Sequence, residues 1–486
     1  MKLPHFFISI KRLFIILVFL FFSQKNDLQA QKAWTLNDCV IYARANNISL
    51  KQLGLNTKRA KINHEQSKAN RLPNLNANTS YGLNFGFAID PTTNSFSSQT
   101  AQSGQLSLSS SVILFNGFQL KNTIEQRELE QELAKLEVDN LANNIDLTVF
   151  TAYMQILLAE EQLKVLQKQT TLTDNQYQQV QKLINVGLRP AGDLLELEAQ
   201  KANDEVNIVN AKNAIKTAYL ALSQALDYYG DFEIETPNKL NIPPLDALNE
   251  TDAETIFEAA KNSQPQIKTA VLRTDIAEKQ EEVLNGAKYP TLSLSGNLNT
   301  RYSSLARQLA SEIPISYDTL INVIIPEPFN TDFPILQPVY DLERTPFFQQ
   351  FSDNFGGFFG FNLAIPIYNR SQVKNSLALA HINIQNSKLA QDFEKNNLQR
   401  TVEQAFLDAK VAAETYKASQ KAVSAQKQAL DFAQKRFAAG VINTFEVLAV
   451  QNASAIAELN MQSAKYQYYF RMKILDFYAG KGISIN

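Results

Sequence analysis

The feature that most constrains this chain is an internal repeat, because its first half returns at low identity in its second half. Val186-Gly187-Leu188 returns as Ala439-Gly440-Val441, with the two glycines 253 residues apart. Upstream, Pro73 returns as Pro290, 217 residues later. Each half predicts a helix, two strands, a long helix, a glycine turn and a final helix. Such a repeat indicates one object built from two similar halves, although the length alone would suggest about three domains.

The repeat also sets the expected boundaries along the chain. Positive residues precede an apolar run at 13–22, and Ala30 precedes Gln31, as in a cleaved secretory signal; an uncleaved anchor is the alternative. Pro243-Pro244 marks the joint between the two halves. We therefore expect a signal peptide at 1–30, a first repeat at 31–229, an inter-repeat linker at 230–251, a second repeat at 252–482 and a tail at 483–486.

Four segments alternate between apolar and small polar residues, as strands with two different faces do. They are residues 75–89, 105–114, 292–302 and 359–367. Their lengths suit tilted strands of an outer membrane, with one face toward lipid; a soluble sandwich is the alternative. No apolar run after the signal is long enough for a membrane helix, so any later span has to be β. Four strands cannot enclose a wet lumen without leaving open edges in lipid, which predicts completion by further copies of the chain.

The loop between the second pair of strands covers roughly 303–356. It is longer than its counterpart by 253 − 217 = 36 residues, because the repeat separation rises from 217 before the strands to 253 after them. It contains Pro314, Pro326, Pro328, Pro334, Pro338 and Pro346. Proline lacks a backbone N–H and argues against regular structure. We expect an irregular cap on the extracellular side, with a ligand-binding loop as the alternative.

Two very long helices are predicted, at 117–186 and 371–439. Both runs are rich in good helix formers and lack proline, and each would be about 105 Å long if continuous. Shorter helices are expected at 191–226 and 444–479, which return alongside, and at 36–70 and 252–287. The narrow apolar stripes favour coiled-coil packing. The predicted fold class is mainly α with membrane β.

Composition and spacing disfavour several classes of protein. A formal net charge of −2 provides no basic surface for nucleic acid. His5, His64 and His381 lack metal-ligand spacing, and we expect the last two to be solvated helix residues. Cys39 is the only cysteine, so we expect no internal disulfide and a small buried residue there. The sequence predicts no enzyme, no metal and no cofactor.

The opening helix and the repeat together resemble a known family. Trp34-Thr35-Leu36-Asn37-Asp38-Cys39, followed by Asn46-Asn47, is similar to the start of TolC-type outer-membrane efflux proteins, and the duplicated tips agree. The resemblance implies a homotrimer with a twelve-stranded β-barrel in outer-membrane lipid and a long α-helical coiled-coil tunnel in the periplasm. It also implies a passive exit duct for drugs, proteins or other solutes. Its partners would be a periplasmic adaptor (membrane fusion protein) and an inner-membrane pump, in tripartite efflux or type I secretion.

The resemblance assigns contacts with the adaptor to the two glycine turns. The candidate docking residues are Val186, Gly187, Leu188, Ala439, Gly440 and Val441. The alternative is that each glycine only reverses the chain where a helix ends.

The family's inner hairpin often carries an arginine two residues after the glycine and acids six and nine residues after it, which close the periplasmic mouth. Ile442, Glu446 and Ala449 occupy these positions, so only Glu446 fits. Closure is therefore expected to depend on apolar tip contacts of Ile442 and Phe445. A local alternative for Glu446 is a capping box with Asn443. With the matching positions of the first hairpin, the candidate gate comprises Glu446, Ile442, Phe445, Asp193 and Arg189.

A coiled-coil periplasmic adaptor, or a structural or adhesin protein of the envelope, is the alternative function. Adaptors usually have one hairpin and a membrane anchor, whereas this sequence predicts duplicated hairpins and four membrane-type strands. Fractionation separates these readings, because an adaptor stays with the inner membrane or the soluble periplasm.

Overall fold

The computed structural model describes residues 33–89, 94, 96–97, 100–237, 240–248, 251–325 and 331–482. The predicted signal peptide at 1–30 and tail at 483–486 lie outside the described residues. The chain divides into two compact units. The helical unit comprises Met1–Thr57, Leu133–Val271 and Leu389–Asn486, and the sheet unit comprises Lys58–Glu132 and Leu272–Lys388.

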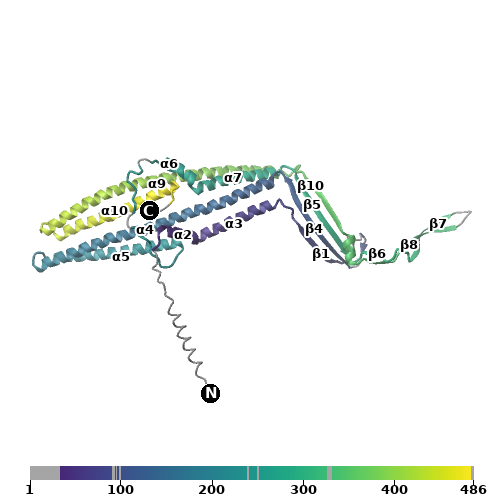
Figure 1. Ribbon diagram of the computed structural model, residues 1–486, viewed down its shortest axis with the longest axis horizontal. Helices are drawn as coiled ribbons and strands as arrows, with labels where there is room; N and C mark the ends of the chain where they lie inside the picture. Colours follow the sequence, from purple (N-terminus) through teal and green to yellow (C-terminus); the bar gives the residue numbers. More distant parts are fainter. Residues whose placement is uncertain are drawn as a thin grey trace, which may run out of the picture. The chain divides into compact units, whose positions relative to one another are not determined.

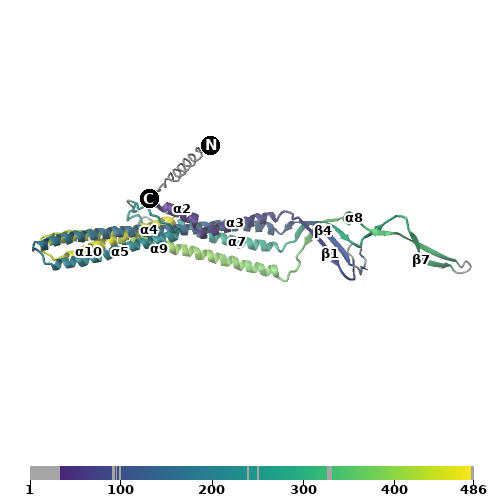
Figure 2. The ribbon, with the colours of Figure 1, turned by 90° about the horizontal axis from the view of Figure 1, so that it is seen from below.

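Two helical hairpins dominate the helical unit and lie side by side in both views (Figures 1 and 2). The first joins α4 (Gln119–Asn185) to α5 (Gly192–Leu226), and the second joins α9 (Gln372–Ala438) to α10 (Thr444–Tyr478). These four helices confirm the predicted runs, and their ends agree closely with the predicted ones. The absence of proline and the run of helix-forming residues are sufficient to explain their lengths.

The helices predicted at 36–70 and 252–287 are present, but each is divided in two by a one-residue break that was not predicted. The pieces are α2 (Leu36–Asn46), α3 (Ile48–Ala69), α6 (Ala253–Ser263) and α7 (Pro265–Gly286). Asn47 ends α2 and its side chain accepts a hydrogen bond of 3.0 Å from the Leu50 N–H, so it caps α3. Gln264 precedes Pro265, which disfavours helical backbone at Gln264.

The main core of the helical unit lies where the N-terminal segment meets the first hairpin and the inter-repeat segment. Trp34 forms a parallel bridge with Ile234, in which its N–H donates to the Glu233 carbonyl at 2.8 Å. Its ring packs against Tyr228 with 5.3 Å between ring centroids. Cys39 is fully buried in this core, as predicted, and burial raises the pKa of its thiol to about 12. The thiol is therefore protonated and unreactive at neutral pH.

The sheet unit contains a four-stranded antiparallel sheet in the order β1-β4-β5-β10. Its strands are β1 (Asn76–Asn84), β4 (Ala101–Asn116), β5 (Thr291–Ser303) and β10 (Gly356–Ala364). All four predicted strand segments are therefore present, with different ends. The two repeats meet at the centre of the sheet, where Leu108 lies opposite Leu298. Within the described chain the outer edges of β1 and β10 have no strand beside them.

The described part of the loop at 303–356 has regular structure, so the prediction of an irregular loop was wrong. It contains β6 (Arg307–Leu309), β7 (Ser316–Ile325), β8 (Thr331–Val339), β9 (Leu342–Arg344) and the short α8 (Phe347–Asp353). β7 and β8 form a two-stranded ribbon, in which Tyr317 lies opposite Pro338. Pro334 and Pro338 are four residues apart on β8, so their backbone nitrogens lie on the same side of the strand. An edge strand tolerates proline where that side faces away from the neighbouring strand. In the first repeat, β2 (Ala88–Ile89) and β3 (Phe96–Ser97) form only a minimal ribbon.

Two glycines let the backbone of the β4–α4 junction touch the backbone at the end of α7, before β5, in the sheet unit. Gly117, between β4 and α4, has φ of 62°. A Cβ at this position would lie 2.3 Å from the Gly286 carbonyl oxygen and 2.8 Å from the Tyr289 Cβ. A Cβ on Gly286 would lie 2.6 Å from the Gly117 carbonyl oxygen. Only glycine fits at these two positions without a shift of the backbone.

The described residues offer neither a membrane helix nor a metal site. None of the helices in the described ranges is both long and apolar enough to cross a membrane. In the same ranges no three His, Cys, Asp or Glu residues are grouped to hold a metal ion. His381 is exposed as predicted. His64 is not, because α3 packs on α4 there: the ring is 6% exposed and its Nδ1 lies 3.1 Å from Oε1 of Gln131.

Candidate functional site at the hairpin tips

The two hairpin tips have the same backbone geometry. Gly187 follows α4 with φ of 78°, and Gly440 follows α9 with φ of 73°. In the first tip the N–H of Leu188 donates to the Leu183 carbonyl at 2.8 Å, and in the second the N–H of Val441 donates to the Arg436 carbonyl at 2.9 Å. Both are Schellman motifs, which need a residue with positive φ and satisfy the last carbonyls of the helix. The repeat has therefore kept a helix-ending device as well as a sequence pattern.

Both tips expose apolar side chains. Val186 is 68% exposed, Leu188 is 70% exposed and Val441 is 64% exposed. Gly187, Ala439 and Gly440 are exposed as well. A Cβ at either glycine would meet nothing within 4 Å. The predicted docking residues thus form an accessible surface at the ends of the two hairpins.

The two tips are joined by a common apolar core within the helical unit. Its buried members are Val180, Leu197, Ala433, Phe437, Ile442, Val447 and Leu448. They come from α4, α5, α9, α10 and the second turn, so neither hairpin tip is packed without the other. Ile442, predicted as an apolar gate contact, is a member of this core and is 6% exposed.

Arg189 is the polar connection between the two tips. Its Nη2 donates to the Phe437 carbonyl at 3.0 Å and to the Ile442 carbonyl at 3.4 Å. Its guanidinium lies over the Phe437 ring, 4.5 Å from the ring centroid. Nη1 forms an ion pair of 3.5 Å with Oδ2 of Asp193, longer than a hydrogen bond. A cation at the carboxyl end of α9 also interacts favourably with the helix dipole. The second hairpin lacks an arginine of its own at position 442, and Arg189 of the first hairpin contacts the second hairpin instead.

The remaining gate candidates lie in the first turn of α10. Glu446 is exposed, and Phe445 is 67% exposed. Asn443 caps the helix by accepting a hydrogen bond of 2.8 Å from the Glu446 backbone N–H. This is one half of the predicted capping box. The cap uses the backbone of Glu446, so its carboxylate is not needed for the capping bond.

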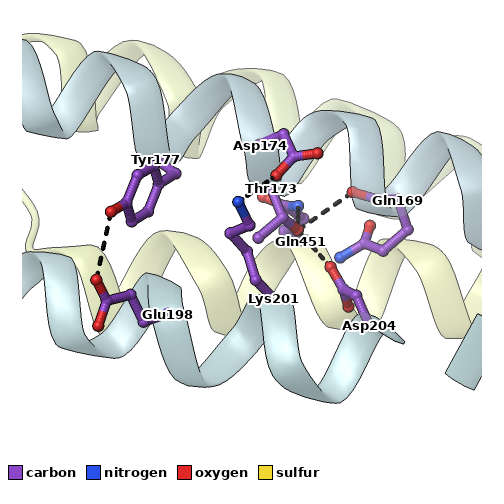
Figure 3. Close-up of polar contacts among 8 residues, drawn as sticks. All are labelled: Gln169, Thr173, Asp174, Tyr177, Glu198, Lys201, Asp204 and Gln451. Atoms are coloured by element: carbon purple, nitrogen blue, oxygen red, sulfur yellow. Dashed lines mark hydrogen bonds and ion pairs between the residues drawn. The ribbon is translucent and has the colours of Figure 1, made fainter. Parts of the chain in front are cut away.

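A buried polar layer ties α10 to the first hairpin further from the tips (Figure 3). Asp204 on α5 is 3% exposed and accepts a hydrogen bond from the Thr173 hydroxyl at 2.7 Å. The Gln200 amide also donates to Asp204, at 2.8 Å. Gln451 on α10 is fully buried and donates to the Thr173 hydroxyl oxygen at 3.2 Å. Asn452 donates to Gln200 at 2.9 Å. Buried polar groups in a coiled coil fix which residues lie opposite one another, because a slip leaves them unpaired.

A family comparison decides the class of this chain. The family described as outer membrane efflux protein matches residues 41–227 and 338–481. The chain belongs to the outer membrane efflux protein family. The match includes both hairpins and both tips.

Solved structures of similar fold agree with this family. A membrane protein from Pseudomonas aeruginosa is similar over 93% of this chain and 92% of its own, with a TM-score of 0.69 and 17% identity. The outer membrane protein VceC of Vibrio cholerae is similar over 92% of this chain and 97% of its own, with a TM-score of 0.66 and 15% identity. The open state of the MtrE outer membrane channel of Neisseria gonorrhoeae is similar over 93% and 89%, with a TM-score of 0.67 and 17% identity. This efflux protein therefore has the protomer fold of outer-membrane channels.

One curated protein matches only a short part of the chain. Anti-silencing protein 2 of Saccharomyces cerevisiae is 28% identical over 144 residues. The matched stretch covers 28% of the efflux protein and 26% of the yeast protein. A match of this extent does not bear on the fold of the whole chain.

Sequence reasoning missed two features of this efflux protein's hairpins. Arg189 was placed in the gate, but its bond to Phe437 joins residues 248 positions apart and has no local signature. The polar layer does have a signal, since Thr173 and Gln451 occupy positions where the helical stripe would otherwise be apolar. Recognising that signal requires the relative register of two hairpins, which periodicity within one helix does not give.

Proposed function

We propose that this efflux protein is the exit duct of a tripartite efflux or type I secretion system. In this proposal it is a homotrimer in the outer membrane, extends into the periplasm, and passively releases drugs, proteins or other solutes. The observation that carries the proposal is the pair of joined hairpin tips, each ending in the same turn and exposing apolar side chains. The two open edges of the sheet support a complex of several copies, because unpaired backbone groups are not tolerated in lipid.

The tips are proposed as the docking surface for a periplasmic adaptor. Leu188 and Val441 lie directly after the two glycines, in corresponding positions of the repeat. Covering a large apolar side chain gains roughly 1.5–3 kcal/mol relative to leaving it in water. A partner with an apolar helical tip gains this at every tip that it covers. The adaptor and the inner-membrane pump behind it supply the energy that a passive duct lacks.

Replacing Leu188 and Val441 by aspartate should uncouple the duct from its adaptor. A carboxylate forced into an apolar contact loses hydration, and a central contact of this kind costs about 2 kcal/mol or more. Binding of the purified adaptor should weaken by roughly 30-fold, measured by biolayer interferometry on the detergent-solubilised protein. Export of substrate should fall with it.

A photo-reactive residue supplies the positional control. Placed at Leu188, it should capture the adaptor in intact cells. Placed at Leu220, which is 54% exposed on α5 and distant in sequence from the tip, it should not. Capture from Leu220 but not Leu188 would place the adaptor elsewhere on the hairpins, and capture from neither would contradict tip docking.

Glu446 is proposed to line the periplasmic mouth. In a symmetric trimer its carboxylate is present three times around one axis and attracts cations. Glu446→Gln should therefore lower the cation-over-anion selectivity of the channel in planar bilayers. The helix cap survives this change, because Asn443 binds the backbone of residue 446. Unchanged selectivity with normal conductance would leave Glu446 without a role in the pore.

A further inference from the structure

The two faces of the four-stranded sheet differ in chemistry, and the short helix α8 lies at one end of this sheet. The strand registers set Leu298 beside Leu108 and Leu294 beside Phe361 on one face. Small polar residues such as Asn297 occupy the other face. In a membrane barrel the apolar face meets lipid and the polar face lines the lumen. The long helices α4 and α9 follow β4 and β10 at the other end of the sheet, so α8 lies at the extracellular end of the proposed duct.

Side chains at α8 complete the hydrogen bonding of β5 where this strand extends past its last pair with β10, at Asn299. Gln350 is 2% exposed and accepts a hydrogen bond of 2.8 Å from the Ser303 N–H. Its amide also donates to the Ser303 carbonyl at 3.0 Å. Asn354, directly after α8, donates to the Arg301 carbonyl at 2.9 Å. Because these bonds satisfy the backbone of β5, this end of the strand can lie at the level of lipid.

The helix α8 packs against the apolar face of the sheet (Figure 2). Thr300 and Tyr302 lie on that face, because they follow Leu298 at intervals of two residues along β5. The Tyr302 ring packs against the Phe347 ring, with 4.9 Å between ring centroids. The Thr300 hydroxyl donates to the Phe351 carbonyl at 2.8 Å. Therefore α8 lies on the side of the sheet that meets lipid, and not on the side that lines the lumen.

One aromatic side chain of α8 is left exposed on this side of the sheet. Phe348 is 84% exposed, and its ring meets the Phe347 ring edge-on at 5.4 Å between centroids. Phe355 follows α8 and is exposed as well. Large apolar side chains gathered in this way mark a surface with an apolar partner. The lipid that covers the apolar face of the neighbouring strands is continuous with this position.

The height of α8 along the sheet agrees with the edge of a lipid bilayer. Tyr302 lies ten positions after Leu292 on β5, which is about 33 Å along an extended strand. At a tilt of about 40° this distance corresponds to about 25 Å along the membrane normal, which is the height of the apolar band of such barrels. Beyond this band Arg307 of β6 lies opposite Arg344 of β9, and charged residues of this kind belong outside the hydrocarbon.

We propose that α8 is an interfacial helix that inserts Phe348 into the outer leaflet of the outer membrane. Its partner is lipid, at the depth where acyl chains meet headgroups and where aromatic side chains are favoured. The inference rests on the proposed function, because it requires the sheet to lie in the outer membrane. It adds a helix on the lipid side of the barrel wall, and it places β6 and β9 at the membrane surface.

Quenching of tryptophan fluorescence by brominated lipids tests this contact. Trp34 is the only tryptophan of the chain, so in a Trp34→Phe background one introduced tryptophan reports alone. The purified oligomer is reconstituted into phosphatidylcholine vesicles with bromine atoms either near the headgroup or near the methyl end of the acyl chain. Phe348→Trp should be quenched at least about twofold more strongly by the shallow bromines than by the deep ones, because the helix lies at the interface.

Two residues of β10 supply matched controls, since they are three positions apart and similarly exposed. Phe361 lies opposite Leu294 on the apolar face, so Phe361→Trp should be quenched more strongly by the deep bromines. Phe358 lies opposite Asn297 on the polar face, so Phe358→Trp should be quenched by neither. The same series with Trp34 retained, and its own signal subtracted, shows whether Trp34→Phe has changed the result.

The outcomes separate this inference from the proposed function. If Phe348→Trp resists both lipids while Phe361→Trp is quenched, the sheet is in lipid but α8 is not, and the inference is overturned alone. A blue-shifted emission in that case would place Phe348 against protein, such as a second copy, and a red-shifted emission would place it in water. If Phe361→Trp also resists both lipids, the apolar face does not meet lipid, and the proposed function fails as well.

Discussion

Gly117→Ala should prevent stable folding of the sheet unit. The new Cβ would lie 2.3 Å from the Gly286 carbonyl oxygen, and this neighbour is backbone rather than a flexible side chain. The φ of 62° adds roughly 1–2 kcal/mol of strain for a residue with a Cβ, and the overlap adds about 1–3 kcal/mol or more. A total of this size is a large share of the stability of a protein, which is only about 5–15 kcal/mol. The amount of assembled protein in the outer membrane should fall sharply.

Two other glycines separate the causes of this effect. Gly187→Ala introduces positive φ strain with nothing within 4 Å of the new Cβ, so it should cost only about 1–2 kcal/mol. Gly54→Ala, inside α3 and also with open space, should stabilise by about 0.5–1 kcal/mol. Thermal unfolding of each purified variant, followed by circular dichroism, ranks the three. If Gly117→Ala melts together with Gly187→Ala, the contact between the two junctions contributes nothing.

Arg189→Met should open the periplasmic end of the duct. The methionine can still cover the Phe437 ring but donates no hydrogen bond, so the carbonyls of Phe437 and Ile442 lose their shared donor. A hydrogen bond from a charged group contributes about 1.5–3 kcal/mol. If the bonds hold the tips together only in the closed state, the ratio of closed to open channels should fall about 10- to 100-fold. Single-channel recording in planar bilayers measures this ratio directly.

Two substitutions sharpen the test of Arg189. Arg189→Lys keeps the charge but loses the planar fork, so it should give an intermediate open probability. Asp193→Asn should have a smaller effect, because its ion pair with Arg189 is already long at 3.5 Å. An unchanged open probability in Arg189→Met, in protein that still forms oligomers, would restrict Arg189 to a structural role within the tips.

The long helices and the strand faces were predictable because each produces a regular spacing of apolar residues within one short stretch of sequence. The broken helices at Asn47 and Gln264 were missed because one polar side chain or one following proline decides them, while the apolar stripe continues across the break. The ribbon of β7 and β8 was missed because proline was taken as a sign of irregular structure, whereas an edge strand tolerates it. The first error concerns only where a helix is interrupted, whereas the second concerns the class of element, because strands were expected to be an irregular loop.

The candidate site was predictable only in part for a related reason. The exposure of Leu188 and Val441 follows from the turn that a glycine makes, which is local. The burial of Ile442 depends on the neighbouring hairpin, and so does the reach of Arg189 to Phe437. Contacts of that kind connect residues far apart in the sequence, and a pattern along one helix contains no information about them.

The bridge between Trp34 and Ile234 has a consequence for the time course of biogenesis. Trp34 is near the start of the chain, and its two backbone bonds are made to Glu233 and Glu235. A chain that enters the periplasm from its N-terminus therefore exposes Trp34 long before its binding partners arrive. Closing a loop of this length is slow compared with local helix formation. We therefore expect the core around Trp34 to stay incomplete until the inter-repeat segment has been translocated, which leaves an apolar surface that a chaperone can bind during that interval.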